Sequence, residues 1–188
     1  ALTRASHQGV MRQELTGHQF EIYFTSYSPD GTLIATSSEG GTWLYDAETG
    51  EQLRFLPENG IVDSIAFSPD GTQMVTTGDF DSGIRLWDVA TGELMQTFVD
   101  DGRVDYAEFT TDGLQIIVYK ADGIQFWEVD SGRRLESIPS QIDDSGDLLT
   151  DLFFAPDGRL QYLMTDADYT RIYFVDSETG ETTCVLLD

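Results

Sequence analysis

The chain alternates between short runs of aromatic and β-branched residues and polar turns that contain glycine. No segment keeps apolar residues at the i, i+3, i+4 and i+7 spacing of an amphipathic helix, so the pattern predicts strands and essentially no helix. Four runs precede an Asp-Gly turn, at residues 20–27, 61–67, 104–109 and 148–154, and four follow it, at residues 33–36, 74–77, 114–119 and 160–164.

The Asp-Gly turns are close copies of one another. The first reads Ser28-Pro29-Asp30-Gly31, and its copies lie at residues 68–71, 110–113 and 155–158. Their aspartates are 40, 42 and 45 residues apart, which is the period of a solenoid, a propeller or an array. Glycine after aspartate supplies the positive φ of a tight hairpin, so each turn joins two antiparallel strands.

Each repeat contains two further runs. The third runs are residues 42–46, 84–88, 124–128 and 171–176, and each leads to a turn with glycine, at Gly50, Gly92, Gly132 and Gly180. The fourth runs are residues 52–56, 94–99, 134–138 and 182–187. Four short antiparallel strands in a repeat of this length predict a propeller blade.

Three motifs carry a resemblance to a known family. They are Gly17-His18, the run Phe-Ser-Pro-Asp-Gly at residues 67–71, and Leu86-Trp87-Asp88, whose equivalents are Tyr45-Asp46, Trp127-Glu128 and Val175-Asp176. With these motifs the chain resembles the WD-repeat family of β-propellers. The resemblance implies an all-β fold of four four-stranded antiparallel blades in a single array over residues 1–188. The repeats span approximately 10–50, 51–92, 93–132 and 133–180, followed by a final outer strand at 181–187.

The phase of the repeats leaves one outer strand in excess. Residues 9–15 match the outer strand of a blade that precedes the first full repeat, and the chain also carries its own final outer strand. Three explanations stay open, because exposed blade faces and sheet edges must be covered. The chain is part of a larger ring, half of a dimeric ring, or a closed ring with one strand displaced.

The resemblance also implies a buried hydrogen-bond network in each blade, which stabilises a blade only when every member has a partner. The residues that match its positions are His18, Ser37, Glu39 and Tyr45 in the first repeat, and Thr77, Asp81 and Trp87, without a histidine, in the second.

Charge excludes several classes of partner. Ten basic and 34 acidic residues give a net charge of −24 at pH 7, which disfavours nucleic acid and anionic membrane surfaces. Such a charge serves solubility and also suits a basic partner. We expect no nucleic acid and no membrane as partners and a cytoplasmic location.

The sequence contains few residues that could support catalysis or hold a cofactor. Cys184 is the only cysteine, and neither His7 nor His18 has metal-binding spacing. The acidic turns at residues 79–81, 143–147 and 166–168 lack the calcium-loop pattern and match turn chemistry. We therefore predict no catalytic residues, no metal site, no cofactor and no enzymatic activity.

A binding surface is the functional feature that the pattern favours. Tyr23, Asp63, Asp105 and Thr150 occupy one equivalent position at the start of the inner strands, and Phe80 and Tyr169 lie in turns before the third strands. The resemblance implies that both positions line the top face of a propeller. Aromatic rings beside carboxylates suit a peptide that carries arginine or lysine, although the two rings could instead pack against neighbouring blades.

Three hypotheses for function follow. The first is a non-enzymatic protein-interaction or scaffold module that binds a protein or peptide through this top face. The second is a structural building block that self-associates to close a propeller ring, as a homodimer or with the remainder of a longer propeller. The third is a propeller enzyme or metal binder.

Overall fold

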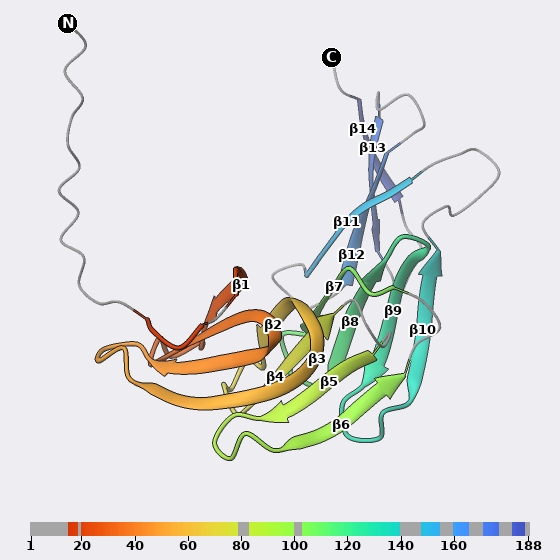
Figure 1. Cartoon of the computed structure of the whole chain (residues 1–188). Coiled ribbons are helices and arrows are strands. Elements are labelled where there is room, and N and C mark those ends of the chain that lie inside the picture. The colour runs from red at the N-terminus through yellow and green to blue at the C-terminus, as the bar shows by residue number, and fades with distance from the viewer. Residues whose placement is uncertain are drawn as a thin grey trace, which may run out of the picture.

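The fold was analysed in a computed structural model of the chain (Figure 1). The structure describes residues 15–18, 20–78, 83–99, 103–139, 148–154, 160–165, 171–176 and 182–186, and for the strands after Pro139 it describes the backbone alone. The described part contains fourteen strands and no helix, so the predicted all-β class is confirmed. No helix long and apolar enough to cross a membrane occurs among these residues.

The four runs of each repeat fall on strands, whereas residues 9–14 of the outer strand predicted before the first repeat lie outside the described residues. The strands are β1 (Ile22–Tyr27), β2 (Leu33–Asp46), β3 (Gln52–Phe67), β4 (Gln73–Gly78), β5 (Gly83–Asp88), β6 (Leu94–Val99), β7 (Tyr106–Phe109), β8 (Gln115–Lys120), β9 (Gly123–Glu128), β10 (Arg134–Pro139), β11 (Leu148–Phe154), β12 (Leu160–Thr165), β13 (Arg171–Asp176) and β14 (Thr182–Leu186). They form a six-stranded sheet, β1 to β6, and two four-stranded sheets, β7 to β10 and β11 to β14.

Two long strands each contain two of the predicted runs. β2 folds back on itself, so that its two ends lie side by side. The amide of Ala47, just after the strand, donates to the carbonyl of Thr32, just before it, at 2.8 Å. Gly40 and Gly41, with φ of 94° and 150°, lie where its pairing changes from β1 to β3. β3 pairs with β2 through its first half and with β4 through its second half.

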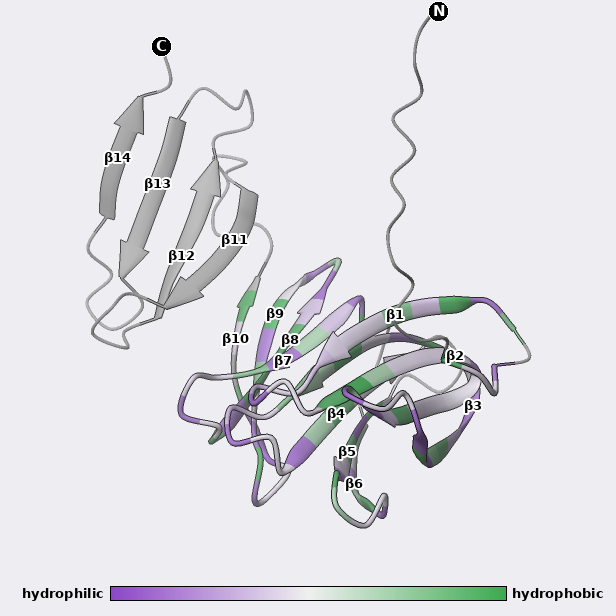
Figure 2. Cartoon of the chain, turned by 90° about the vertical axis from the view of Figure 1, so that its left-hand side faces the viewer, coloured by the Kyte–Doolittle hydropathy of each residue, from purple (hydrophilic) through white to green (hydrophobic). Residues whose placement is uncertain are grey.

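The six-stranded sheet therefore consists of two units. We call β1, β2 and residues 52–57 of β3 the first sheet, and residues 62–67 of β3 with β4 to β6 the second sheet. β7 to β10 are the third sheet and β11 to β14 the fourth sheet. In Figures 1 and 2 the first and third sheets lie at opposite ends of the array that these three form.

Apolar side chains fill the space between consecutive sheets. Ala35, Leu44 and Leu56 of the first sheet pack with Met74 and Trp87 of the second. A second cluster joins the opposite face of the second sheet to the third; it contains Val75, Ile84, Leu86, Phe98, Ala107, Ile116, Val118 and Trp127. Because strand side chains alternate between faces, the second sheet buries both of its faces in this way.

The first three Asp-Gly turns are closed by hydrogen bonds to their aspartates. Asp30 Oδ1 accepts from Ser28 Oγ at 2.6 Å and from the Thr32 amide at 3.0 Å. Asp70 and Asp112 repeat the arrangement, with hydroxyl contacts of 2.7 and 2.6 Å. These hydrogen bonds, led by the one from the preceding hydroxyl, lower the pKa of all three carboxyls.

Acidification should therefore weaken the fold through these turns. A lowered pKa in the folded state contributes stability above the ordinary value of 3.8, and this contribution is lost as pH falls below it. We expect the unfolding free energy of the wild type to fall toward that of Asp70→Asn as pH is lowered from about 5 to about 2, measured by urea denaturation. Acid also relieves the repulsion among the many negative charges, but it does so in both proteins, so the difference between wild type and Asp70→Asn reports the Asp70 carboxyl. Parallel pH profiles of the two proteins would contradict the prediction.

Candidate functional site: the top face and the buried network

Bulges displace the predicted binding residues from the regular register of the inner strands. The pairing skips Tyr23 between Ile22 and Phe24, Asp63 between Val62 and Ser64, and Thr150 between Leu149 and Asp151. A bulge bends its strand and re-aims the side chain at that point. In the third repeat the equivalent Asp105 lies just before β7, and its amide donates to the Tyr119 carbonyl at 2.9 Å.

A guanidinium group already occupies the space between the two aspartates. Arg103 Nε donates to Asp105 Oδ1 at 3.3 Å, and Arg103 Nη2 lies 3.9 Å from Asp63 Oδ2. The Arg103 side chain is 65% exposed, against 50% for Asp105 and 24% for Asp63. The structure thus brings two of the predicted residues together, and Arg103, which the sequence did not single out, bridges the second and third sheets.

The structure describes only some of the other predicted surface residues. Tyr23 is 45% exposed at the start of β1. Thr150 is described by its backbone position alone, and Phe80 and Tyr169 lie outside the described residues. Among the residues that are described, no group of three His, Cys, Asp or Glu side chains could hold a metal ion.

Three aromatic residues, Phe24, Tyr106 and Tyr119, pack together. Tyr106, next to Asp105, has its ring 6.4 Å from Phe24 of β1 and 5.7 Å from Tyr119 of β8. Tyr119 donates from its hydroxyl to Glu108 Oε1 at 2.8 Å. Burial raises the pKa of Tyr106, so this ring is a neutral part of the packing between the first and third sheets.

The network of the first repeat is arranged differently from the prediction. His18 Nε2 is 2.7 Å from Thr36 Oγ1, and the Tyr45 hydroxyl donates to the Thr16 carbonyl at 2.8 Å. Ser37 instead donates to the Val62 carbonyl at 2.8 Å, and Glu39 is exposed. The predicted hydroxyl is wrong by one residue, which in a strand moves the side chain to the opposite face.

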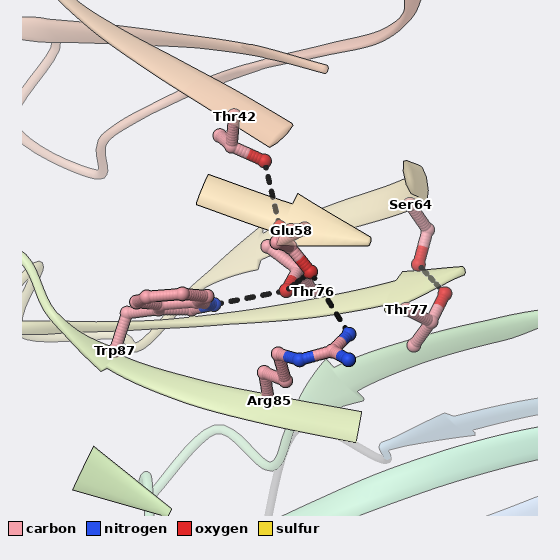
Figure 3. A network of polar contacts seen from close by, with 7 residues as sticks. All are labelled: Thr42, Glu58, Ser64, Thr76, Thr77, Arg85 and Trp87. Atoms are coloured by element: carbon pink, nitrogen blue, oxygen red, sulfur yellow. Dashed lines mark hydrogen bonds and ion pairs between the residues drawn. The ribbon is translucent and has the colours of Figure 1, made fainter. Parts of the chain in front are cut away.

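The second repeat shows the same shift. Trp87 Nε1 donates to Thr76 Oγ1 at 2.9 Å, whereas the predicted Thr77 pairs with Ser64 at 2.7 Å (Figure 3). Asp81, also predicted, lies outside the described residues. Thr76 and Thr77 are both buried, so composition alone does not distinguish them, and the pairing of β4 with β5 decides which one faces the tryptophan.

Glu58 takes the place of the missing histidine. It precedes Thr76 by 18 residues, the same separation as His18 from Thr36, and this equivalence could have revealed it in the sequence. Its Oε2 accepts from Thr76 at 2.9 Å and from Arg85 Nη1 at 3.2 Å, and its Oε1 accepts from Thr42 at 3.2 Å. The carboxylate therefore lies between the first and second sheets and contacts both (Figure 3).

Burial dominates the electrostatics of this carboxylate. The Glu58 side chain is 1% exposed and that of Arg85 is 11% exposed. Desolvation raises the pKa of Glu58, while the hydrogen bond from Thr76 and the charge of Arg85 oppose the rise. A buried ion pair of this kind is costly to break, since one charge would be left uncompensated.

The third repeat lacks the hydroxyl altogether. Val118 pairs with Gln125 as Thr76 pairs with Arg85, so Val118 occupies the position of the missing threonine. Trp127 Nε1 and Gln125 Oε1 are buried and have no hydrogen-bond partner. The three repeats thus carry three different polar sets at equivalent positions.

Comparison with known proteins identifies the repeats. Residues 9–46 and 50–88 match the family model described as WD domain, G-beta repeat. These two segments are WD repeats. The resemblance to the WD-repeat family is thereby confirmed, and propellers of this family generally serve as scaffolds for protein interactions and are generally not enzymes.

The named relatives share the repeats over part of their length. Jouberin of Rattus norvegicus is 35% identical over 80 residues, which are 41% of this chain and 8% of that protein. Eukaryotic translation initiation factor 3 subunit I of Phaeosphaeria nodorum is 33% identical over 79 residues, 42% of this chain and 24% of that protein. The chain therefore matches less than a quarter of the length of these relatives.

A solved structure shows the same fold. The β-propeller domain of Cps50 (Swd1) from Myceliophteria thermophila superposes with a TM-score of 0.73 at 17% identity, over 92% of this chain and 57% of that chain. The sheet architecture of the chain is thus that of a propeller, and the chain spans somewhat more than half of the solved one.

Removing the hydroxyl at position 76 and adding one at position 118 should have opposite effects on the stability of the fold. Thr76→Val leaves the buried Trp87 Nε1 without an acceptor and should cost about 1–3 kcal/mol of unfolding free energy. Val118→Thr gives Trp127 Nε1 an acceptor and should stabilise the fold by up to about 1 kcal/mol. Urea denaturation followed by tryptophan fluorescence measures both. Destabilisation by Val118→Thr would mean that its hydroxyl does not reach Trp127.

Removal of Arg85 tests the buried ion pair. Arg85→Met should cost about 3–5 kcal/mol at neutral pH, because Glu58 is left as an unpaired buried charge. The pKa of Glu58 is above its ordinary value of 4.5, so its protonated form favours the folded state, and the deficit should shrink as pH falls toward that value. Arg133→Met, which breaks the exposed contact with Glu128, is the control and should cost less than about 1 kcal/mol. A deficit that stays constant with pH would assign the role of Arg85 to its aliphatic stem.

Proposed function

We propose that this chain is a non-enzymatic interaction module that binds a protein or peptide bearing arginine or lysine on its top face. The surface comprises Tyr23, Asp63 and Asp105, together with the predicted Phe80, Thr150 and Tyr169. The observation that supports the proposal is the position of Arg103 between Asp63 and Asp105. Two carboxylates that are spaced to contact one guanidinium group can also contact the guanidinium group of a partner.

The energetics of this surface suit a moderate affinity. Exposed ion pairs contribute about 0–1 kcal/mol each, so the carboxylates confer charge selectivity more than tight binding. The half-exposed Tyr23 offers ring area for the aliphatic stem or the cationic group of a partner side chain. A net charge of −24 attracts a cationic partner from a distance.

The contacts of His18 favour a binding role for the chain over a catalytic one. His18 lies in the interior network of the first repeat, where Thr36 holds its Nε2 at 2.7 Å, and burial lowers its pKa. A ring held in this way is part of the packing of the first repeat. The cytoplasmic location stays a prediction.

A short cationic probe tests the top face directly. A fluorescein-labelled tetra-arginine peptide should bind the wild type, and Asp63→Asn with Asp105→Asn should weaken binding about two- to thirtyfold, measured by fluorescence polarisation. The control is Glu51→Gln with Glu93→Gln, which removes the same charge from exposed positions beside the turns that follow the third strands. Equal losses in both double variants would show non-specific attraction and reject the site.

The Arg103 contact supplies a second arm to this experiment. Arg103→Ala removes the guanidinium that contacts both carboxylates and should strengthen binding of the same peptide, whereas simple loss of a structural ion pair would leave it unchanged or weaker. Thermal melting of each variant verifies that the fold is retained, because the side chains concerned are partly exposed.

A further inference from the structure

A cavity lies between the first and second sheets, at the end that carries the Asp-Gly turns. It has a volume of about 440 Å³, and its apolar lining consists of Leu33, Leu44, Leu53 and Val89. The pairing of β2 with β3 skips Leu53, and this irregularity allows Leu53 as well as its neighbour Arg54 to line the cavity. Every lining residue belongs to two consecutive described sheets, so no residue outside the described part is needed to form the cavity.

The apolar lining is particular to this pair of sheets. The positions that correspond to Leu33 in the second and third repeats are Gln73 and Gln115, whose carbonyls accept the same hydrogen bond across the Asp-Gly turn. Gln73 Nε2 donates to Sδ of Met95 at 3.8 Å, and Met95 is the equivalent of Leu53. Leucine at position 33 therefore removes a polar group from this place alone among the three described turns.

The rim of the cavity is polar and carries no net charge. Arg54 Nη2 donates to the Ala90 carbonyl, and Asp88 Oδ1 accepts from the Thr91 amide at 2.7 Å and from its hydroxyl at 2.8 Å. The hydrogen bonds from Thr91 and the charge of Arg54 lower the pKa of Asp88, so both side chains are charged at neutral pH. Of the three guanidinium nitrogens, only Nη2 has an acceptor among the residues that the structure describes. The rim thus offers donors to a neutral acceptor such as a peptide carbonyl.

A strand edge runs along the same cavity. Residues 52–57 of β3 contribute Leu53 and Arg54 to the lining, and in the described part of the chain they pair with β2 alone. The other edge of these residues presents backbone N–H and C=O groups to which an extended segment can add. Alternate side chains of such a segment point to the same side, about 7 Å apart, so two of them reach one cavity.

We infer that this cavity binds two aliphatic side chains of an uncharged, extended peptide segment, at a second site separate from the top face. Its volume is about three times the roughly 150 Å³ that holds one benzene ring, which is room for two leucine-sized side chains. The free donors of Arg54 suit the carbonyls of the segment, and the neutral rim selects against charge. This chemistry differs from that of the cationic partner proposed for Asp63 and Asp105, at the opposite ends of the inner strands.

A neutral peptide with two leucines tests the cavity. A fluorescein-labelled Ser-Leu-Ser-Leu-Ser peptide with an amidated C-terminus should bind the wild type, measured by fluorescence polarisation. Leu33→Gln introduces the glutamine of the other repeats and should weaken binding about five- to thirtyfold. Arg54→Met keeps an aliphatic stem against Gly92, removes the donors and should weaken binding about two- to tenfold. A peptide with serine in place of both leucines should not bind.

The controls separate this site from other surfaces. Leu114→Gln makes the matched change at a side chain that is 63% exposed in the Asp-Gly turn of the third sheet, and it should leave the affinity unchanged. Asp63→Asn with Asp105→Asn should also leave it unchanged, so failure of the top-face proposal and failure of this one are distinguishable. Ala90→Trp covers the cavity from an exposed position on its rim and should weaken binding even if Leu33→Gln does not fold, which thermal melting detects.

Several results would overturn the inference. They are a leucine peptide that does not bind saturably, unchanged binding by Ala90→Trp or by a folded Leu33→Gln, and equal losses in Leu33→Gln and Leu114→Gln. Competition with N-acetyl-leucinamide identifies the kind of occupant. If this small molecule competes as strongly as the unlabelled peptide, the cavity takes a small apolar ligand and the extended segment is rejected.

Discussion

The buried Glu58 carboxylate is the interaction on which the first interface between sheets depends. Its two oxygens reach Thr42 on one sheet and Thr76 and Arg85 on the next, so the contact is satisfied only when both sheets are in register. Apolar packing between sheets tolerates small shifts, whereas a desolvated carboxylate does not, since any slip leaves a charge unpaired. The hydrophobic clusters thus supply most of the burial, and Glu58 determines how the two sheets align.

The same place in each repeat carries different chemistry. The first repeat packs His18 against Trp43 with tilted rings, the second pairs Glu58 with Arg85, and the third has Gln125 and a Trp127 whose Nε1 has no hydrogen-bond partner among the described residues. Equivalent apolar positions would allow any sheet to pack on any other. Distinct polar sets penalise the wrong neighbour, because a mismatched partner leaves buried polar groups unpaired. Degeneration of the repeat motif is therefore consistent with a fixed order of sheets.

Most of the fold could be predicted from the sequence, because strand runs and Asp-Gly turns are local features. The merging of runs into β2 and β3 could not, since it depends on how sheets join at Gly40, Gly41 and residues 57–62. The network prediction failed by one residue at Thr36 and Thr76, because neighbouring hydroxyls differ only in the face they occupy. Asp63 and Asp105 were predicted through repeat equivalence, but the bridging Arg103 repeats at no other copy, so no periodic signal marks it.

Positions that recur in each repeat differ in role from positions that vary between repeats. The turn aspartates recur because each closes the same hairpin with the same hydroxyl and amide donors. At the other end of the same inner strands, the equivalent positions are Tyr23, Asp63, Asp105 and Thr150, which carry three different kinds of side chain. A bulge supports the strand through its backbone, so its side chain is released from packing and can vary. A propeller blade therefore has one end where its own folding sets the sequence and another where a partner can.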